Sequence, residues 1–565
     1  MRENSKFQYV AFVFIPSIAI ALYLNSFNNS FHFDDISSIV ENPYIRDLRN
    51  LPLFLKGLGV KTNWFRVLPT LSFAINYHFH GLNVFGYHLV NLILHILSGF
   101  LVYFISRNLF TLGLEKRGSP DQWTKRIDLL SLLTAALFIS HPIQVNTVTY
   151  IVERNEGLAS FFYLLSFFLF MKGSFSKGLP RLFFFLGVAV TFLLAILSKE
   201  ISLTLPLVLI LFDLLFVCKN REMIRKRLTV YLGVSIPLVL YLLFFLKGGV
   251  LTLLFRTSRP WTPWENLLTQ SNVIIQYCRL LLLPLPQWLN VDHDFQVARS
   301  FFEYPTFLSL SVILLLLISA TLLIKKSRLI SFSVFCFFII LAPTSSIIPI
   351  WDIMVEYRLY LPLFFYVLLL TTGLHYLDGF VAQRFSKRSR QVIALGIPIL
   401  ILGFYSLTTI ERNRIFKDDL TLWFDAAKKS PNKMRVHHNL GKAYWGKGRV
   451  DEAIREAEIA LKLSGTLDIK QNVKYVLNLL GGTYFLKGET DKAIRVLQRA
   501  IEIDPNYATS YYNLSCIHAV KGERGMALEY LKKALTLDPN YREKAKRDKD
   551  FGSLRGEKEF DEMIK

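Results

Sequence analysis

The stretch YHLVNLILHILSGFLVYFISRNL, residues 87–109, carries no charged side chain before Arg107. A helix needs about 20 mostly apolar residues to cross the hydrocarbon core of a bilayer, so we expect 87–109 to span a membrane. Similar apolar stretches recur from residue 7 to about residue 409. The predicted spans, about eleven in number, are 7–24, 87–109, 127–141, 156–171, 181–197, 201–217, 228–246, 304–324, 329–349, 357–376 and 391–409.

The composition agrees with a membrane protein. Of the 565 residues, 52% are hydrophobic and only 19% are charged, and the mean hydropathy is +0.36. The formal net charge is +22, but the basic residues gather in short loops between apolar stretches, as the positive-inside rule requires. The sequence lacks zinc-finger spacing, an RNP motif and a basic stripe with interleaved aromatics, so we expect no nucleic-acid partner.

Loop charge also predicts the topology. The basic loops 110–126, 172–181 and 218–227 should be cytoplasmic, as should an uncleaved N-terminus. Counting 268–285 as a crossing would put the later basic loops outside, so we interpret it as an interfacial or re-entrant helix, and 66–80 as a helix along the outer surface. The odd number of crossings then places the C-terminal part outside.

The C-terminal part contains a repeat. The stretches HHNLGKAYWGKGRVDEAIREAEIAL, NLLGGTYFLKGETDKAIRVLQRAIEIDP and YYNLSCIHAVKGERGMALEYLKKALTLDP align with small residues in register. This pattern is typical of tetratricopeptide repeats, in which small residues let paired helices approach closely. We predict a membrane domain over 1–412 and a repeat domain over 413–565, with repeats near 434–465, 474–507 and 508–541, a partial repeat before them and a capping helix pair after them.

Polar residues interrupt the apolar part at a few places. They lie in FDD (33–35), GYHLVNLILH (86–95), HPIQVNTVTYIVERNEGLAS (141–160), SKE (198–200) and EYRLYLP (356–362). Ionisable groups at membrane depth commonly mark a working site. Most of these stretches fall at the predicted outer ends of spans. The candidate site residues are Asp34, Asp35, Glu153, Arg154, Lys199, Glu200, Glu356 and Arg358, with His88, Asn91 and His141 in support.

Such a mixture of carboxylates and cations suits the reaction of a hydroxyl with a phosphate-bearing donor. A carboxylate accepts the proton of the hydroxyl, and cations stabilise the charge that develops on the departing phosphate. Structural alternatives stay open: the aspartates could cap a helix, Lys199 and Glu200 could form an ion pair, and Arg358 could reach the membrane interface.

The ordered motifs FDD, GYHLVNLILH, HPIQVNTV, SKE and EYRLYLP, followed by tetratricopeptide repeats, resemble the transmembrane-and-tetratricopeptide (TMTC-type) O-mannosyltransferases and their bacterial relatives. The resemblance implies an all-α, polytopic glycosyltransferase of the GT-C fold. It also implies a polyprenyl-phosphate sugar as donor, an inverting displacement and a location in a bacterial inner membrane. The acceptor would be a protein Ser or Thr on the extracytoplasmic side, and the repeats would bind the acceptor polypeptide or a partner protein.

The resemblance also implies roles for individual residues. Asp34 is the best candidate base, with Asp35 as its rival. Lys199 and Arg358 would bind the donor phosphate, joined by Arg154. Glu200 and Glu356 would orient Lys199 and Arg358.

Some questions stay open from the sequence. The chain departs from the family pattern at RVLP (66–69) and ERN (153–155), which leaves the roles of Arg66, Glu153 and Arg154 undecided. A divalent metal at the paired aspartates is possible, while packing or hydrogen bonding is the preferred interpretation of the histidines. The alternatives in function are a glycan ligase, a lipid-modifying glycosyltransferase, and a non-enzymatic repeat scaffold for envelope assembly.

Overall fold

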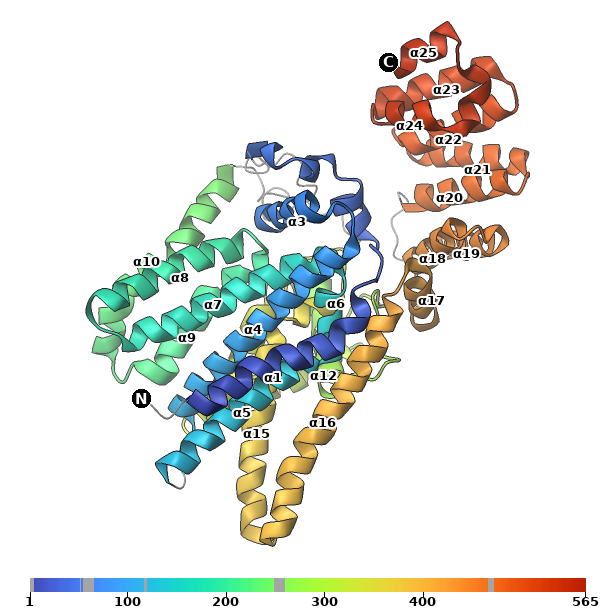
Figure 1. Ribbon diagram of the computed structural model, residues 1–565. Coiled ribbons are helices and arrows are strands. Elements are labelled where there is room, and N and C mark those ends of the chain that lie inside the picture. Colours follow the sequence, from blue (N-terminus) through green and yellow to red (C-terminus); the bar gives the residue numbers. More distant parts are fainter. Residues whose placement is uncertain (1–4, 51, 54–65, 116–118, 248–259, 466–471) are drawn as a thin grey trace. The chain divides into compact units, whose positions relative to one another are not determined.

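The computed structural model describes residues 5–50, 52–53, 66–115, 119–247, 260–465 and 472–565. Throughout these ranges the regular elements are helices, and no strand occurs in them (Figure 1). The predicted all-α class, with membrane helices followed by tetratricopeptide repeats, is confirmed.

The chain forms two compact units. The first comprises residues 1–291 and 295–418, and the second comprises residues 292–294 and 419–565. The first unit thus ends a few residues after the predicted boundary at 412/413. The inclusion of 292–294 in the second unit was not predicted.

Eight helical segments in the described residues are long and apolar enough to span a membrane. They correspond to α1 (Ser5–Tyr23), α4 (Val84–Gly113), α7 (Arg154–Phe175), α8 (Gly178–Ile196), α9 (Leu205–Phe212) with its flanking turns, α13 (Thr306–Leu323), α15 (Pro362–Arg384) and α16 (Lys387–Ile415). A ninth span results if α5 (Pro120–Ser140) is joined to the segment Pro142–Val148, from which it is bent by 48°.

Two of the eleven predicted spans are not among these candidates in the described residues. They are 228–246 and 329–349, which correspond to α10 (Arg221–Lys247) and α14 (Arg328–Leu341). Several side chains in the last part of α10 lie outside the described residues, so the crossing at 228–246 stays a prediction, whereas α14 is a helix of 14 residues. Pro343 follows α14 closely, and its nitrogen carries no hydrogen with which to continue the helical hydrogen bonds.

Two helices correspond to the segments that we interpreted as lying at the membrane surface. α12 (Pro263–Leu282) is not among the candidate spans. Its buried face is partly polar: the side-chain amide of Asn266 donates to the carbonyls of Ser346 and Ile348, and that of Gln270 donates to the carbonyl of Ile353. α3 (Val67–His80) lies at the start of the described range 66–115. Their position relative to a membrane stays a prediction.

Several helix ends meet at one end of the first unit, which we call the aspartate end because Asp34 and Asp35 follow α1 there. Figure 1 shows α1, α4 and α5 side by side. The C-terminal ends of α1, α5 and α16 are joined by hydrogen bonds from the Asn413 amide to the Leu22 carbonyl (3.0 Å) and from the Thr409 hydroxyl to the Ser140 carbonyl (2.7 Å). α7 and α15 begin at this end, so polar residues that precede them are brought close to the aspartates.

The second unit is a stack of helix pairs. The pairs are α18 (Met434–Gly446) with α19 (Val450–Lys462), α20 (Val473–Leu486) with α21 (Thr490–Ile503), and α22 (Ala508–Val520) with α23 (Arg524–Leu537). α17 (Asp419–Lys429) precedes them, and α24 (Tyr541–Arg547) and α25 (Lys558–Ile564) follow.

The expected close approach within a pair occurs at the predicted small residues. A Cβ atom added to Gly481 would lie 2.5 Å from Cγ of Leu497 on the paired helix. Added to Gly441, it would lie 3.2 Å from the carbonyl oxygen of Ala453. Only glycine fits at Gly481 without a shift of the Leu497 side chain.

Candidate functional site

The loop after α1 places the two adjacent aspartates in different environments. Asp34 is exposed, whereas Asp35 is fully buried. Phe33, directly before them, has a φ of 40° and is the only non-glycine residue with positive φ in the described parts of the chain. This conformation is unfavourable for a bulky residue by about 1–2 kcal/mol. The strained turn gives two adjacent carboxyl groups opposite environments.

Asp35 anchors the loop. Its carboxylate accepts hydrogen bonds from the backbone amides of His32 (2.9 Å) and Val152 (2.7 Å). Burial raises its pKa to about 7, although these two amides act in the opposite direction. Asp35 thus joins the loop after α1 to the residues just before α7, and its neighbour Asp34 is left facing outward.

The segment that Asp35 contacts is the most continuously buried part of the chain: each residue from 141 to 160 is buried. Here the helical path breaks at His141, whose Nδ1 accepts from the amide of Ile143 and whose Nε2 contacts the carbonyl of Leu281 at 3.1 Å. The Asn91 amide donates to the carbonyl of Val148 (3.2 Å). These side chains satisfy backbone groups that the broken helix leaves unpaired.

His88 also contacts a backbone group at the aspartate end: its Nε2 lies 3.0 Å from the carbonyl oxygen of Asn29. The supporting residues predicted from the sequence, His88, Asn91 and His141, therefore all contact backbone in the described structure. For the histidines this agrees with the interpretation as hydrogen-bonding residues.

Lys199 lies between two carboxylates. Its Nζ is 3.2 Å from Oε2 of Glu153 and 3.0 Å from Oε2 of Glu156, and it stands 4.3 Å from the centre of the Tyr357 ring. Burial lowers the pKa of Lys199, but Glu153 and Glu156 outweigh it, and the net shift is upward. The partners of this ammonium group are thus Glu153 and Glu156, and the ion pair with Glu200 that the sequence left open is not the one formed.

Arg66 supplies a cation that is less enclosed. Its side chain is half-buried. Burial lowers its pKa, while Glu200, Glu153, Tyr357 and Asp34 raise it, and the net shift is upward. Within the described part of the chain Arg66 forms no ion pair at 4 Å or closer. Because no acid pairs with it at short range in the described residues, the guanidinium of Arg66 can donate hydrogen bonds to an anionic ligand.

Glu356 belongs to a different cluster from the one predicted. Its Oε2 accepts from Arg412 (2.5 Å) and from the Asn146 amide (2.8 Å), and its Oε1 accepts from the backbone amide of Asn290 (2.6 Å). The acid therefore orients Arg412 at the end of α16, and not Arg358 as we expected. Such a buried pair holds α16 against the broken segment after α5.

Arg358 is buried and donates to two backbone carbonyls, those of Ile353 (3.2 Å) and Asp352 (2.7 Å). Burial lowers its pKa, but Tyr277, Tyr357 and Asp352 raise it, and the net shift is upward. This guanidinium stays charged while it holds the chain that leads into α15. These two bonds use two of the five N–H donors of the guanidinium, and its predicted contact with a phosphate stays a prediction.

Arg154 has the arrangement of a structural arginine. It is 1% exposed. Its Nε donates to Oδ1 of Asn91 (2.7 Å), Nη2 to the carbonyl of Tyr87 (3.0 Å) and Nη1 to Ser72. The guanidinium also stacks 4.6 Å above the ring of Phe73. In the described conformation it joins α3, α4 and α7 and has no donor directed toward a ligand.

The paired aspartates do not form a joint ligand set for a metal. Both carboxylate oxygens of Asp35 accept backbone amides, and this group faces inward while Asp34 faces outward. Among the described residues, three potential ligand atoms come within 4.8 Å of one another only at Cys516, Asp548 and Asp550 in the second unit. The residues at Asp34 and Asp35 therefore do not fit a shared ion, and no step below uses one.

Sequence reasoning missed Glu156, Arg412 and Tyr357 as partners of the predicted residues, and it left Arg66 without a role. Glu156 and Tyr357 lie inside stretches that the sequence singled out, so an acid one helical turn after Glu153 was a usable signal. Arg412 lay at the predicted domain boundary, where a basic residue is more typical of a helix end.

The described structure thus defines a polytopic helical membrane protein with a polar cluster at one end of its helices and a tetratricopeptide unit. Family models agree with the second unit: one described as "TPR repeat" matches residues 481–522, and one described as "Tetratricopeptide repeat" matches residues 435–466 and 508–541.

Similarity to curated proteins extends over both units. The chain is 25% identical over 521 residues to "Protein O-mannosyl-transferase Tmtc3" of Drosophila melanogaster, covering 80% of this chain and 55% of the relative. It is 26% identical to "Protein O-mannosyl-transferase TMTC4" of Homo sapiens (78% of this chain, 64% of the relative). It is 23% identical to "Protein O-mannosyl-transferase F38B6.6" of Caenorhabditis elegans (79% and 62%). The predicted resemblance to the TMTC-type proteins is confirmed.

This chain spans only 55% to 64% of the length of those three relatives. Among solved structures, "Crystal structure of MamA" matches 26% of this chain and 80% of its own chain at 25% identity with a TM-score of 0.21.

Proposed function

We propose that this protein is a membrane glycosyltransferase that transfers a hexose, mannose, from a polyprenyl-phosphate carrier to the hydroxyl of a protein Ser or Thr on the extracytoplasmic side. The names of its relatives support mannosyl transfer to protein. The observation that carries the proposal is the exposed carboxylate of Asp34, which is held outward by the buried Asp35 and lies within electrostatic influence of Arg66.

Asp34 is the base in this proposal. Asp35 engages both of its oxygens with backbone amides, so it would have to break the loop anchor in order to accept a proton from a ligand. Asp34 faces outward, and the Tyr150 hydroxyl accepts from its backbone amide at 3.1 Å. That contact fixes the backbone on which the carboxylate is mounted. A base that is both exposed and positioned can reach the hydroxyl of a polypeptide.

Arg66 is the cation that meets the donor phosphate. It is half-buried and acts within a cluster of acids that includes Glu200 and Asp34. Lys199 acts indirectly, because its ammonium group holds Glu153 and Glu156. Phosphate binding by Lys199 and Arg358 stays a prediction, because Lys199 pairs with two carboxylates and Arg358 donates to two backbone carbonyls.

The reaction balances with these groups alone. The acceptor O–H proton passes to the carboxylate of Asp34 as the acceptor oxygen bonds to the anomeric carbon. The bond between that carbon and the phosphate oxygen breaks, and the electron pair leaves with the polyprenyl phosphate. Arg66 stabilises the negative charge on this leaving group. Attack opposite the phosphate inverts the anomeric configuration.

The second unit supplies the acceptor in this proposal. Stacked helix pairs of this kind commonly bind an extended peptide or a partner protein on one surface. The repeats would hold a polypeptide substrate while its hydroxyl reacts.

Full-length protein in lipid nanodiscs, supplied with polyprenyl-phosphate [14C]mannose and a pool of synthetic Ser- and Thr-containing peptides, tests the assignment. We expect labelled peptide, and we expect Asp34→Asn to reduce its formation at least about 100-fold, because general-base catalysis contributes about 10²–10⁴. Asp47→Asn is the matched control: this partly exposed acid in the same loop pairs with Arg49 (2.6 Å), and its substitution should leave transfer unchanged.

Release of free [14C]mannose to water separates donor use from acceptor use. Arg66→Gln should lower both transfer and release, since it acts on the leaving phosphate. Full transfer by Asp34→Asn would show that the base is another group. A chain that inserts correctly but neither transfers nor releases sugar from any polyprenyl-phosphate hexose would favour the scaffold alternative.

A further inference from the structure

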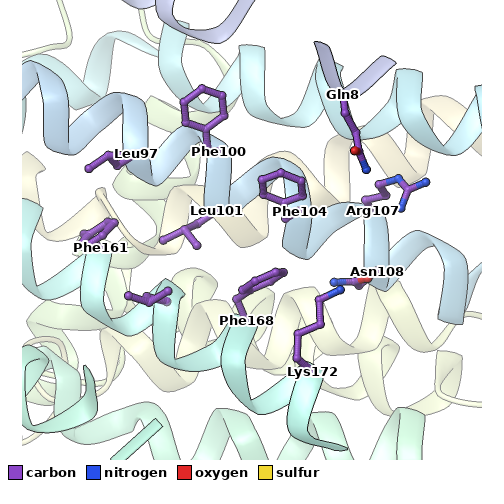
Figure 2. Close-up of a pocket in the computed structure, with 11 residues that line it drawn as sticks. Gln8, Leu97, Phe100, Leu101, Phe104, Arg107, Asn108, Phe161, Phe168 and Lys172 are labelled. Atoms are coloured by element: carbon purple, nitrogen blue, oxygen red, sulfur yellow. The ribbon is translucent and has the colours of Figure 1, made fainter. Parts of the chain in front are cut away.

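A cavity of about 370 Å³ lies between α1, α4 and α7, away from the aspartate end. Its size falls within the range of about 300–1,000 Å³ typical of ligand sites. Figure 2 shows that the side chains lining it are of two kinds. Phenylalanine and leucine side chains occupy most of the wall, and the polar ends of Gln8, Arg107, Asn108 and Lys172 gather at one end.

The apolar wall is built from rings in mutual contact. The Phe100 ring lies 5.1 Å from that of Phe12, and the Phe104 ring lies 6.0 Å from that of Phe168. These rings are partly exposed toward the surroundings of the bundle. Such a surface offers a fixed apolar track along the helices, to which a hydrocarbon chain can pack.

The polar end carries a cation that is available to a ligand. Lys172 is exposed, its Nζ stands 5.3 Å from the centre of the Phe168 ring, and it has no ion pair at 4 Å or closer within the described ranges. Arg107 pairs through its Nε with Asp128 at 2.5 Å. Asp128 neutralises one of the two cations, so the polar end keeps a net positive charge.

The position of Lys172 along α7 gives the depth of the polar end in the membrane. Lys172 is 18 residues after Arg154, which begins α7 at the aspartate end, and 18 residues of α-helix span about 27 Å. That length is close to the hydrocarbon thickness of a bilayer, about 30 Å. The polar end of the cavity therefore lies at the level of the opposite membrane interface from Asp34, where the basic loops gather.

We propose that this cavity binds one anionic phospholipid, with its phosphate at Lys172 and Arg107 and an acyl chain along Phe100, Phe104 and Phe168. Basic pockets between membrane helices at the cytoplasmic interface recognise such headgroups. A polyprenyl-phosphate donor bound here would hold its phosphate about 27 Å from the aspartate end, so the ligand is a structural lipid and not the donor. The proposal does not depend on glycosyl transfer.

Lipid retention by the purified full-length chain tests this site. Protein stripped of lipid in detergent is mixed with equal amounts of phosphatidylglycerol and phosphatidylcholine of the same acyl chains, and bound lipids are counted by native mass spectrometry. We expect phosphatidylglycerol to be retained preferentially. Lys172→Gln should reduce its retention about fivefold, because one basic residue contributes about 1 kcal/mol toward an anionic headgroup.

Lys177→Gln is the matched control, since Lys177 is an exposed lysine just beyond α7 that does not line the cavity. Leu165→Trp, which fills the cavity, should reduce retention of both lipids. Lys172 is exposed, so its substitution leaves the fold intact. Equal retention of the two lipids, or equal losses with Lys172→Gln and Lys177→Gln, would overturn the proposal.

Discussion

The two units of this protein are built from different kinds of contact. In the repeat unit, the helices that pack closely are neighbours in the sequence, such as α20 and α21. In the membrane unit, the groups that form the polar cluster are far apart: Asp35 meets Val152 and Asn146 meets Glu356, separations of 117 and 210 residues. The loss of one contact should therefore destabilise only neighbouring helices in the repeats, whereas at the aspartate end it should destabilise several helices.

The largest expected effect comes from the buried pair of Glu356 and Arg412. Arg412→Met leaves the fully buried acid with an uncompensated charge, which costs about 3–5 kcal/mol. The apparent melting temperature of the purified protein should fall markedly. Arg414→Met removes an exposed arginine two residues away and should have little effect.

A double variant sharpens this result. Removing both charges with Glu356→Met and Arg412→Met should recover part of the lost stability, since a buried pair replaced by apolar groups is often nearly neutral. Equal melting temperatures of Arg412→Met and Arg414→Met would show that the cluster does not hold the unit together.

A smaller effect should follow from the raised pKa of Asp35. The folded state holds the Asp35 proton up to about pH 7, whereas the unfolded chain releases it near pH 4. The folded form binds more protons in this window, so the contribution of Asp35 to stability is complete below pH 4 and is lost as the pH rises through about 7. The loss amounts to at most about 4 kcal/mol at 1.36 kcal/mol per unit.

Melting temperatures measured from pH 4.5 to pH 8 test this dependence. Asp35→Asn cannot ionise and should flatten the profile, although the amide loses one of the two backbone hydrogen bonds. Asp34→Asn should keep the slope of the unmodified protein. The same slope in Asp35→Asn would assign the proton to another group.

The smallest effect, and the most local, is expected in the repeats. Gly481→Ala puts a Cβ 2.5 Å from Cγ of Leu497 and should destabilise the α20–α21 pair by about 1–3 kcal/mol. Gly482→Ala, next in the chain, meets nothing closer than 3.8 Å and should be neutral or stabilising. Hydrogen–deuterium exchange of the full chain should show faster exchange in α20 and α21 only for Gly481→Ala, and unchanged exchange in α4 and α7.

This contrast also explains what the sequence could predict. The helical class, most of the spans and the register of Gly441 and Gly481 follow from local periodicity, and they agree with the structure. The stretches that contribute to the polar cluster were also predictable, because charges are costly at membrane depth. The ion-pair partners could not be predicted, because long-range packing decides which helix ends meet. Lys199 pairs with Glu153 and Glu156, and Glu356 pairs with Arg412.

The predicted membrane spans show a second limit of sequence analysis. Hydropathy alone treated 329–349 as a crossing, but the helix ends at Leu341. Pro343 is visible in the sequence and indicates a helix end, but the prediction gave more weight to the apolar composition of 329–349. The strained backbone at Phe33, by contrast, has no signal in a single sequence.

The three residues 292–294 have a practical consequence for any attempt to divide this protein. Asp292 is held in the second unit by Lys433 (2.5 Å) and Arg435 (2.7 Å), and although burial raises its pKa, these two cations lower it below the ordinary value. A chain that stops before Asp419 lacks both cations, and residues 292–294 lose the ion pairs that anchor them. Division of the chain at the boundary between the units in sequence therefore also removes the anchor of a loop that lies more than 120 residues earlier.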